Sequence, residues 1–176
     1  MDHIVVSALL KQMVTQNGKS VFDLSVGNEV MLVFLRHFGC FFCREALDEI
    51  SKLKQVLSTK GVKVVFVHMS ENSIADQYFD KYEFQDANHV SDKECYYYSM
   101  FKLGKASLKQ LFSLQSFIRG FDNVVLKGGG GGLATAATGD EYQMPGIFII
   151  REGKIVNQFI HKDPSDRPNY VNLLNS

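Results

Sequence analysis

The sequence lacks net charge, long apolar runs and a recognisable secretory signal, and each absence excludes a class of protein. Nineteen lysines and arginines balance nineteen aspartates and glutamates, so no charged surface for nucleic acid or for an anionic membrane is expected. No run approaches the roughly 18 apolar residues that a membrane-spanning helix needs. The first residues have an acidic side chain and no small-residue cleavage pattern, so no secretory signal is predicted.

Cysteine is scarce, and its number is odd. Three cysteines in 176 residues are too few for a disulfide scaffold, and at least one must stay unpaired. We therefore expect a protein of the reducing cytoplasm.

Apolar spacing predicts alternating strands and helices along the chain. Buried strands are expected at 30–38 and 62–70, where branched and aromatic residues follow one another. Helical spacing predicts helices at 4–17, 43–61, 71–83, 95–104, 105–120 and 165–174, with a short strand within 88–94. Two β-rich runs within 144–161, joined at 151–154, predict a hairpin.

This order predicts an α/β fold, a thioredoxin-like three-layer sandwich with a mixed central sheet and flanking helices. Strands joined through helices pair in parallel, and the hairpin adds antiparallel strands at one side. We expect a single domain over 1–176, with an N-terminal extension at 1–20 and an insertion at 105–141. Five consecutive glycines in this insertion predict a flexible loop, and the GK[ST] motif of a phosphate-binding loop is missing.

Cys40 and Cys43 form a C-x-x-C pair in the stretch RHFGCFFCRE. A zinc site needs four ligands, but a second such pair is absent and no two histidines have ligand spacing. A structural disulfide is disfavoured because closing so short a loop removes little chain entropy. A further alternative is that both cysteines simply pack as small buried side chains and have no redox role. A redox-active dithiol is the leading hypothesis.

The pair lies where a predicted buried strand passes into a helix. The helix dipole and the free amides of the first turn favour a thiolate, and such sites lower the pKa of a cysteine. Arg36, His37 and Arg44 add positive charge nearby and are expected to tune the thiolate. Because the thiolate is the nucleophile of disulfide exchange, this location supports redox chemistry.

A proline directly before a predicted strand indicates a tight entry turn. Pro145 fits such a turn with a cis peptide bond, and in a thioredoxin-like sheet it faces the dithiol. The Met144 backbone is then expected to pair with a bound substrate chain, in a groove that includes Phe41 and Phe42. Cys95 begins an apolar helical segment and is expected to be a buried free thiol.

Four blocks of the sequence resemble the peroxiredoxin-like branch of the alkyl hydroperoxide reductase/thiol-specific antioxidant superfamily, which includes prostamide/prostaglandin F synthase. They are VFLRHFGCFFCRE, VKVVFVHMSE, DKECYYYSMFKLG and GIFIIREGKIVNQFIHKDPSDRPN. The resemblance implies a thioredoxin fold, redox-active Cys40 and Cys43, and an antioxidant role. It implies no bound cofactor but an external thiol reductant such as thioredoxin or glutathione, and it is compatible with a homodimer.

The sequence departs from the peroxiredoxin pattern P-x-x-x-T-x-x-C followed by a distant arginine. Aligned with that pattern, Cys43 takes the position of the peroxidatic cysteine. Cys40 then replaces the threonine, Arg36 the proline and Pro145 the arginine. Without these donors the departing oxygen of a peroxide lacks preorganised stabilisation, which favours disulfide exchange.

Three functional hypotheses follow. The leading one is a thiol-disulfide oxidoreductase in which Cys40 attacks, Cys43 resolves, and the partner is a disulfide-bearing protein or a thioredoxin-type reductant. The alternative is a thiol peroxidase that reduces hydroperoxides through Cys43. The third is a non-catalytic thioredoxin-like binding module that docks through Phe38, Phe41 and Phe42.

Overall fold

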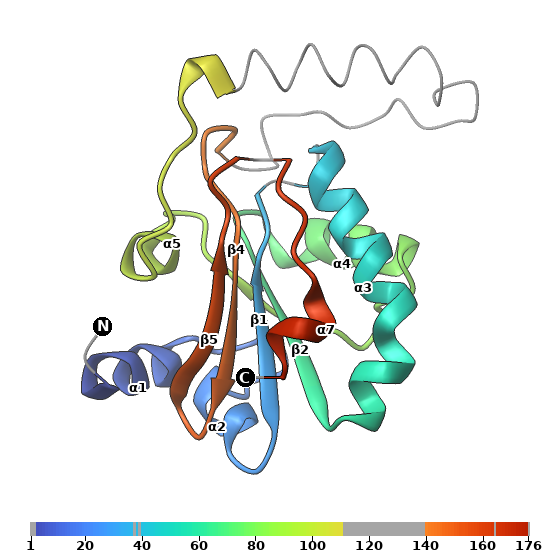
Figure 1. The fold of residues 1–176 in the computed structure, drawn as a ribbon, viewed down its shortest axis with the longest axis vertical. Coiled ribbons are helices and arrows are strands. Elements are labelled where there is room, and N and C mark those ends of the chain that lie inside the picture. The colour runs from blue at the N-terminus through green and yellow to red at the C-terminus, as the bar shows by residue number, and fades with distance from the viewer. Residues whose placement is uncertain (1–2, 37, 39, 111–139, 164, 176) are drawn as a thin grey trace.

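The computed structural model describes residues 3–36, 38, 40–110, 140–163 and 165–175, shown in colour in Figure 1. Its helices are α1 (His3–Gln12), α2 (Val21–Ser25), α3 (Phe41–Thr59), α4 (Asn72–Lys81), α5 (Tyr96–Met100) and α7 (Tyr170–Leu173). Its strands are β1 (Glu29–Phe34), β2 (Val62–His68), β3 (Asn88–Ser91), β4 (Gly146–Arg151) and β5 (Lys154–Ile160). No helix in these ranges is long and apolar enough to cross a membrane.

The five strands form one mixed sheet in the order β3-β2-β1-β4-β5. The central strand β1 is parallel to β2, and β2 is parallel to β3. The hairpin of β4 and β5 joins the other side of β1 in antiparallel pairing. The predicted combination of parallel strands with a hairpin at one side is therefore confirmed.

Helices cover both faces of this sheet (Figure 1). Side chains alternate along β1, because successive residues of a strand point to opposite faces. Met31 and Val33 belong to a core cluster that includes residues of α3, α4 and α7. Val30 and Leu32 belong to a second cluster, with residues of α1, α2 and α5. The predicted thioredoxin-like α/β sandwich is confirmed.

A short helix, α2, is absent from the elements predicted from the sequence. Its start is fixed by a capping box, in which the Asp23 N–H donates to the Ser20 hydroxyl at 3.0 Å. The Asp23 carboxylate in turn accepts from the Ser20 N–H at 3.4 Å. The S-x-x-D spacing was the signal available in the sequence.

The first strand is shorter than predicted. It ends at Phe34. The Leu35 N–H still donates to the carbonyl of Val67 in β2, and the Arg36 N–H then turns to the sulfur of Cys43. The predicted helix at 105–120 and the glycine-rich loop fall largely or wholly within 111–139, outside the described residues.

The turn between β4 and β5 has a glycine at which a larger residue would be strained. Gly153 has a φ of 69°, in the left-handed region that favours glycine. A Cβ added there would clash with the ring of Phe22 in α2. The hairpin and α2 are therefore closely packed at this point.

Candidate active site

The two cysteines of the C-x-x-C pair lie at the carboxyl end of β1, where α3 begins. Cys40 is the N-cap of α3, and Cys43 lies in the first turn of that helix. Both are free thiols, with only 4% and 5% of their surfaces exposed. The 19-residue helix behind them places its positive dipole end at the sulfurs.

Arg36 contacts both sulfurs. Its backbone N–H donates to Cys43 Sγ at 3.0 Å, and its Nη1 donates to Cys40 Sγ at 3.3 Å. Its Nη2 donates to the carbonyl of Glu141, which ties the guanidinium to the segment before β4. One residue thus holds the dithiol through both its backbone and its side chain.

The Arg36 guanidinium is a buried charge, with 3% of the residue exposed. None of the ion pairs among the described residues gives it a carboxylate partner. A buried cation is costly unless an anion compensates it. The Asp140 carboxylate interacts with this charge electrostatically. The group hydrogen-bonded to the guanidinium that can become an anion is the Cys40 thiol, so this geometry favours a thiolate at Cys40.

A small pocket of about 30 Å³ opens at the dithiol. Its lining includes both cysteines together with Arg36, Pro145, His161 and Tyr170. A water needs at least roughly 10–15 Å³ by this measure, so the pocket has room for about two groups of that size.

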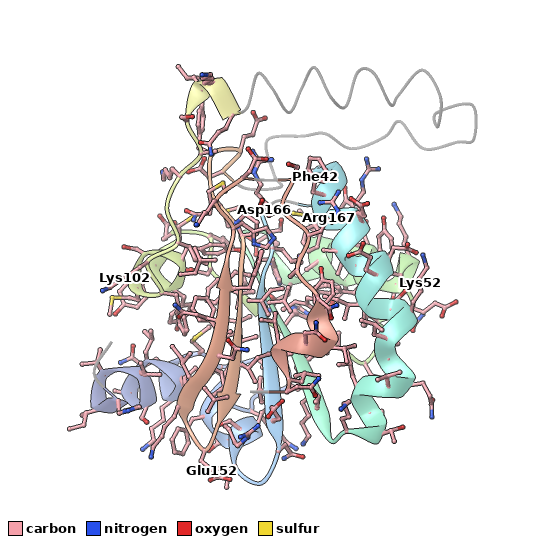
Figure 2. The ribbon with its side chains drawn as sticks, in the orientation of Figure 1. Phe42, Lys52, Lys102, Glu152, Asp166 and Arg167 are labelled. Carbon is pink, nitrogen blue, oxygen red and sulfur yellow. The ribbon has the colours of Figure 1, made fainter. Side chains whose placement is uncertain are left out.

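The outer wall of the pocket is built from the segment before α7. The guanidinium of Arg167 lies over the ring of Phe42, 4.5 Å from its centre, and forms an ion pair with Glu45. Figure 2 shows Phe42, Asp166 and Arg167 gathered where α3 begins. Phe42 is buried beneath this cation, so it lines the pocket without offering an exposed apolar surface.

The backbone before Pro145 already has partners within the chain. The Met144 N–H donates to the Gly104 carbonyl at 3.0 Å. The side-chain amide of Gln143 donates to the carbonyls of Leu103, Gly104 and Met144. Segment 103–106 therefore occupies the edge at which the sequence predicted a substrate chain. The predicted cis peptide bond at Pro145 is wrong, since the described residues contain none.

His161 is a pocket residue that sequence reasoning missed. Burial lowers the pKa of His161 to about 4, although Asp166 and the backbone of Pro145 oppose this. Its Nδ1 is shielded from solvent and has no hydrogen-bond partner among the described residues. The sequence carried no local signal for it, because it lies more than a hundred residues after the cysteines.

Several predicted site residues lie elsewhere. His37 is outside the described residues, and of Phe41 only the backbone is described, at the start of α3. Arg44 does not line the pocket. Its charge acts instead on Tyr82: burial raises the pKa of Tyr82, and Arg44 opposes that rise. Phe38 is buried and stacks on Tyr78 with ring centres 4.6 Å apart, so it is a core residue and not a docking surface.

Cys95 is only partly buried, and its Sγ lies 3.3 Å from the sulfur of Met69. Burial raises the pKa of Cys95, and the negative charge of Asp92 adds to that rise. Cys95 does not line the dithiol pocket. The prediction that Cys95 is a buried thiol is therefore wrong, because the residue is only partly buried.

His68, His89 and Asp76 form a chain of hydrogen-bonded side chains, the histidine relay, next to Phe38. His68 Nδ1 accepts the Ser70 N–H at 3.3 Å, so Nε2 carries the proton and donates to His89 Nδ1 at 2.9 Å. His89 Nε2 then donates to the Asp76 carboxylate at 2.9 Å. Burial lowers the pKa of His68 to about 3 and also lowers the pKa of His89. The ring of Phe38 packs on His68 with centres 5.6 Å apart.

Comparison with family models found no match. The chain is 30% identical over 159 residues to a prostamide/prostaglandin F synthase of Danio rerio, covering 88% of this chain and 77% of the relative. It is 27% identical over 181 residues to Peroxiredoxin-like 2A of Bos taurus, covering 99% and 76%. Among solved structures, a cysteine-to-serine mutant of Peroxiredoxin Q from Xanthomonas campestris superposes with a TM-score of 0.63 at 13% identity, covering 95% and 90%.

Proposed function

Because the chain belongs to the peroxiredoxin-like, thioredoxin-fold family that includes prostamide/prostaglandin F synthase, we propose that it reduces small peroxides through its Cys40–Cys43 dithiol. The observation that carries this proposal is the buried Arg36 guanidinium, 3.3 Å from Cys40 Sγ. In the alignment with the peroxiredoxin pattern, Pro145 takes the position of the arginine. Arg36, from a different place in the chain, supplies a guanidinium at the sulfur of Cys40.

The narrow access to the two sulfurs favours a small substrate. Both sulfurs are buried, and the pocket in front of them has room for only about two water-sized groups. A protein disulfide would also need the backbone edge at Met144, which segment 103–106 already uses. A hydroperoxide presents two oxygens in line and needs no such edge.

The reaction has two steps at the dithiol. The Cys40 thiolate attacks the terminal oxygen of the hydroperoxide, an S–O bond forms, and the O–O bond breaks. The departing alkoxide takes a proton and leaves as the alcohol, with Cys40 as a sulfenic acid. Cys43 Sγ then attacks Cys40 Sγ, the disulfide forms, and water leaves. An external thiol reductant, such as thioredoxin or glutathione, returns two electrons and restores the dithiol.

Arg36 has a defined part in the first step. Its guanidinium compensates the thiolate in the resting site and lies where negative charge moves toward the departing oxygen. Preorganised donors of this kind contribute strongly in a site that excludes water.

Thiol-disulfide exchange is the second candidate. The C-x-x-C spacing places an attacking and a resolving thiol in one helical turn, which is the requirement for that reaction. In this case the substrate is a disulfide-bearing protein, and segment 103–106 must leave the Met144 edge before it binds.

The test compares both substrates on the full chain and on two serine variants. We expect the unmodified protein to consume one equivalent of hydrogen peroxide with loss of two thiols, and to reduce insulin far more slowly. Cys40→Ser should lose peroxide consumption, whereas Cys43→Ser should consume one equivalent and stop at the sulfenic acid. The opposite pattern would make Cys43 the peroxidatic residue. Insulin reduction without peroxide consumption would make the protein a disulfide oxidoreductase. If neither activity is detected, the result supports the non-catalytic binding module.

Arg36 is tested separately with a matched control on α3. Arg36→Met should slow peroxide consumption by about 10²-fold, the usual effect of removing one preorganised donor. Arg44→Met removes the same charge outside the pocket and should leave the rate nearly unchanged. Equal rates for the two variants would contradict the role of Arg36.

A further inference from the structure

The imidazole of His161 lies in the dithiol pocket with one nitrogen unused. His161 follows the last residue of β5, and its ring lines the pocket with Cys40 and Cys43. Its ring packs edge-on against Phe159, with centres 4.9 Å apart. Nδ1 has no partner among the described residues, although water does not reach it. A buried polar atom of this kind calls for an explanation, and a catalytic role is one.

A neutral imidazole keeps one ring nitrogen that can accept a proton. The backbone of Pro145 acts on the His161 ring and opposes the lowering of its pKa, but burial outweighs it. Burial holds the pKa of His161 at about 4, so the ring is neutral near pH 7.

The second step of the proposed reaction needs a group of this kind. When Cys43 attacks the oxidised Cys40, its thiol must lose a proton, and the departing hydroxide must gain one. Arg36 and Arg167 line the pocket but cannot accept a proton. Glu49 and Asp166 also line the pocket and are carboxylates that can accept a proton. Asp166 Oδ2 already accepts the N–H groups of Lys162 and Asp163, so Glu49 is the main competing group.

We propose that His161 accepts the Cys43 proton during this attack and passes it to the departing hydroxide. The S–S bond forms as the S–O bond breaks, Cys43 is oxidised as Cys40 is reduced, and water leaves. His161 ends the step neutral, as it began. The inference rests on the proposed function for its substrate but concerns the resolving step, which any oxidant of Cys40 must pass through.

The test separates the two steps in a His161→Gln variant of the full chain, in which an amide replaces the imidazole. One equivalent of hydrogen peroxide is added, the sulfenic acid is trapped with dimedone, and disulfide formation is followed by mass. We expect the sulfenic acid to form at the normal rate and the disulfide to form about 10²-fold more slowly, the size of a general acid–base contribution. His3→Gln, the same substitution at an exposed position of α1, is the matched control and should behave like the unmodified protein. Glu49→Gln tests the competing acceptor: slow disulfide formation in that variant would overturn the role of His161.

A second readout does not depend on peroxide. The small reagent methyl methanethiosulfonate releases methanesulfinate when Cys40 attacks it and methanethiol when Cys43 resolves the mixed disulfide, and both are followed by mass. His161→Gln should slow the second release by about 10²-fold and leave the first unchanged. If the unmodified protein ignores peroxide but shows this split, the peroxidase function fails and the role of His161 stands. Normal second release, equal slowing of both releases, or the same split in Glu49→Gln would overturn that role.

Discussion

The buried histidine relay makes the stability of the fold depend on acidity. His68 has a pKa of about 3 in the folded chain, against an ordinary value of 6.5. Because the folded pKa lies below the unfolded one, the unfolded chain binds more protons as the pH falls. The stabilising contribution of neutral His68 is therefore fully present above about pH 6.5 and is lost as the pH falls toward about 3.

The size of the effect follows from these two values. Between about pH 7 and about pH 5, the linkage relation gives a loss of about 2 kcal/mol from His68 alone. His89 acts in the same direction, because burial lowers its pKa as well. Two carboxyls act in the opposite direction, since burial raises the pKa of Glu49 and of Asp92. A comparison of variants removes these shared contributions.

The assay is urea unfolding at several pH values, carried out on the unmodified protein, on His68→Gln and on His3→Gln. The free energy of unfolding should fall less steeply with acid in His68→Gln, by about 2 kcal/mol over this range. His3 is exposed on α1, so its removal should leave the pH dependence unchanged. Parallel curves for the unmodified protein and His68→Gln would refute the reasoning, whatever the absolute stability of the variant.

Three further predictions concern packing and access. Tyr98→Phe removes a buried hydroxyl that donates to the carbonyls at the ends of β1 and β2, and should lower the free energy of unfolding by about 1–3 kcal/mol in a denaturant titration. Gly153→Ala should destabilise by about 1–3 kcal/mol because of its positive φ and the ring of Phe22, whereas Gly104→Ala, with open space around it, should be nearly neutral in the same measurement. Gln143→Leu loosens segment 103–106 and should increase the rate of insulin reduction; an unchanged rate would mean that this segment does not limit access.

The elements and the place of the dithiol could be read from the sequence because both depend on local patterns. Apolar runs marked β1 and β2, and helical spacing marked α3. The position of Cys40 and Cys43 at the junction follows directly from that order of elements. Short-range signals were missed only where they were weak, as with the capping box that begins α2.

The interior of the site could not be predicted, because it depends on contacts between distant segments. Nothing in the spacing of Arg36 shows that its side chain returns to Cys40 while reaching Glu141, 105 residues away. His161 enters the pocket only because β5 pairs with β4 and β4 with β1. The Met144 edge looked open because the hydrogen bonds that close it come from 103–106. Pattern and spacing carry no information on such pairings.

The double contact of Arg36 has a consequence for the reduction potential of the dithiol. With a thiolate at Cys40, the reduced form gives the buried guanidinium its counter-ion, and closing the disulfide takes that counter-ion away. The fold thereby stabilises the reduced state over the oxidised one, which makes the disulfide a stronger oxidant. Each tenfold preference for the reduced form raises the potential by about 30 mV. In the proposed cycle, this effect of Arg36 makes the disulfide easier for an external thiol reductant to reopen.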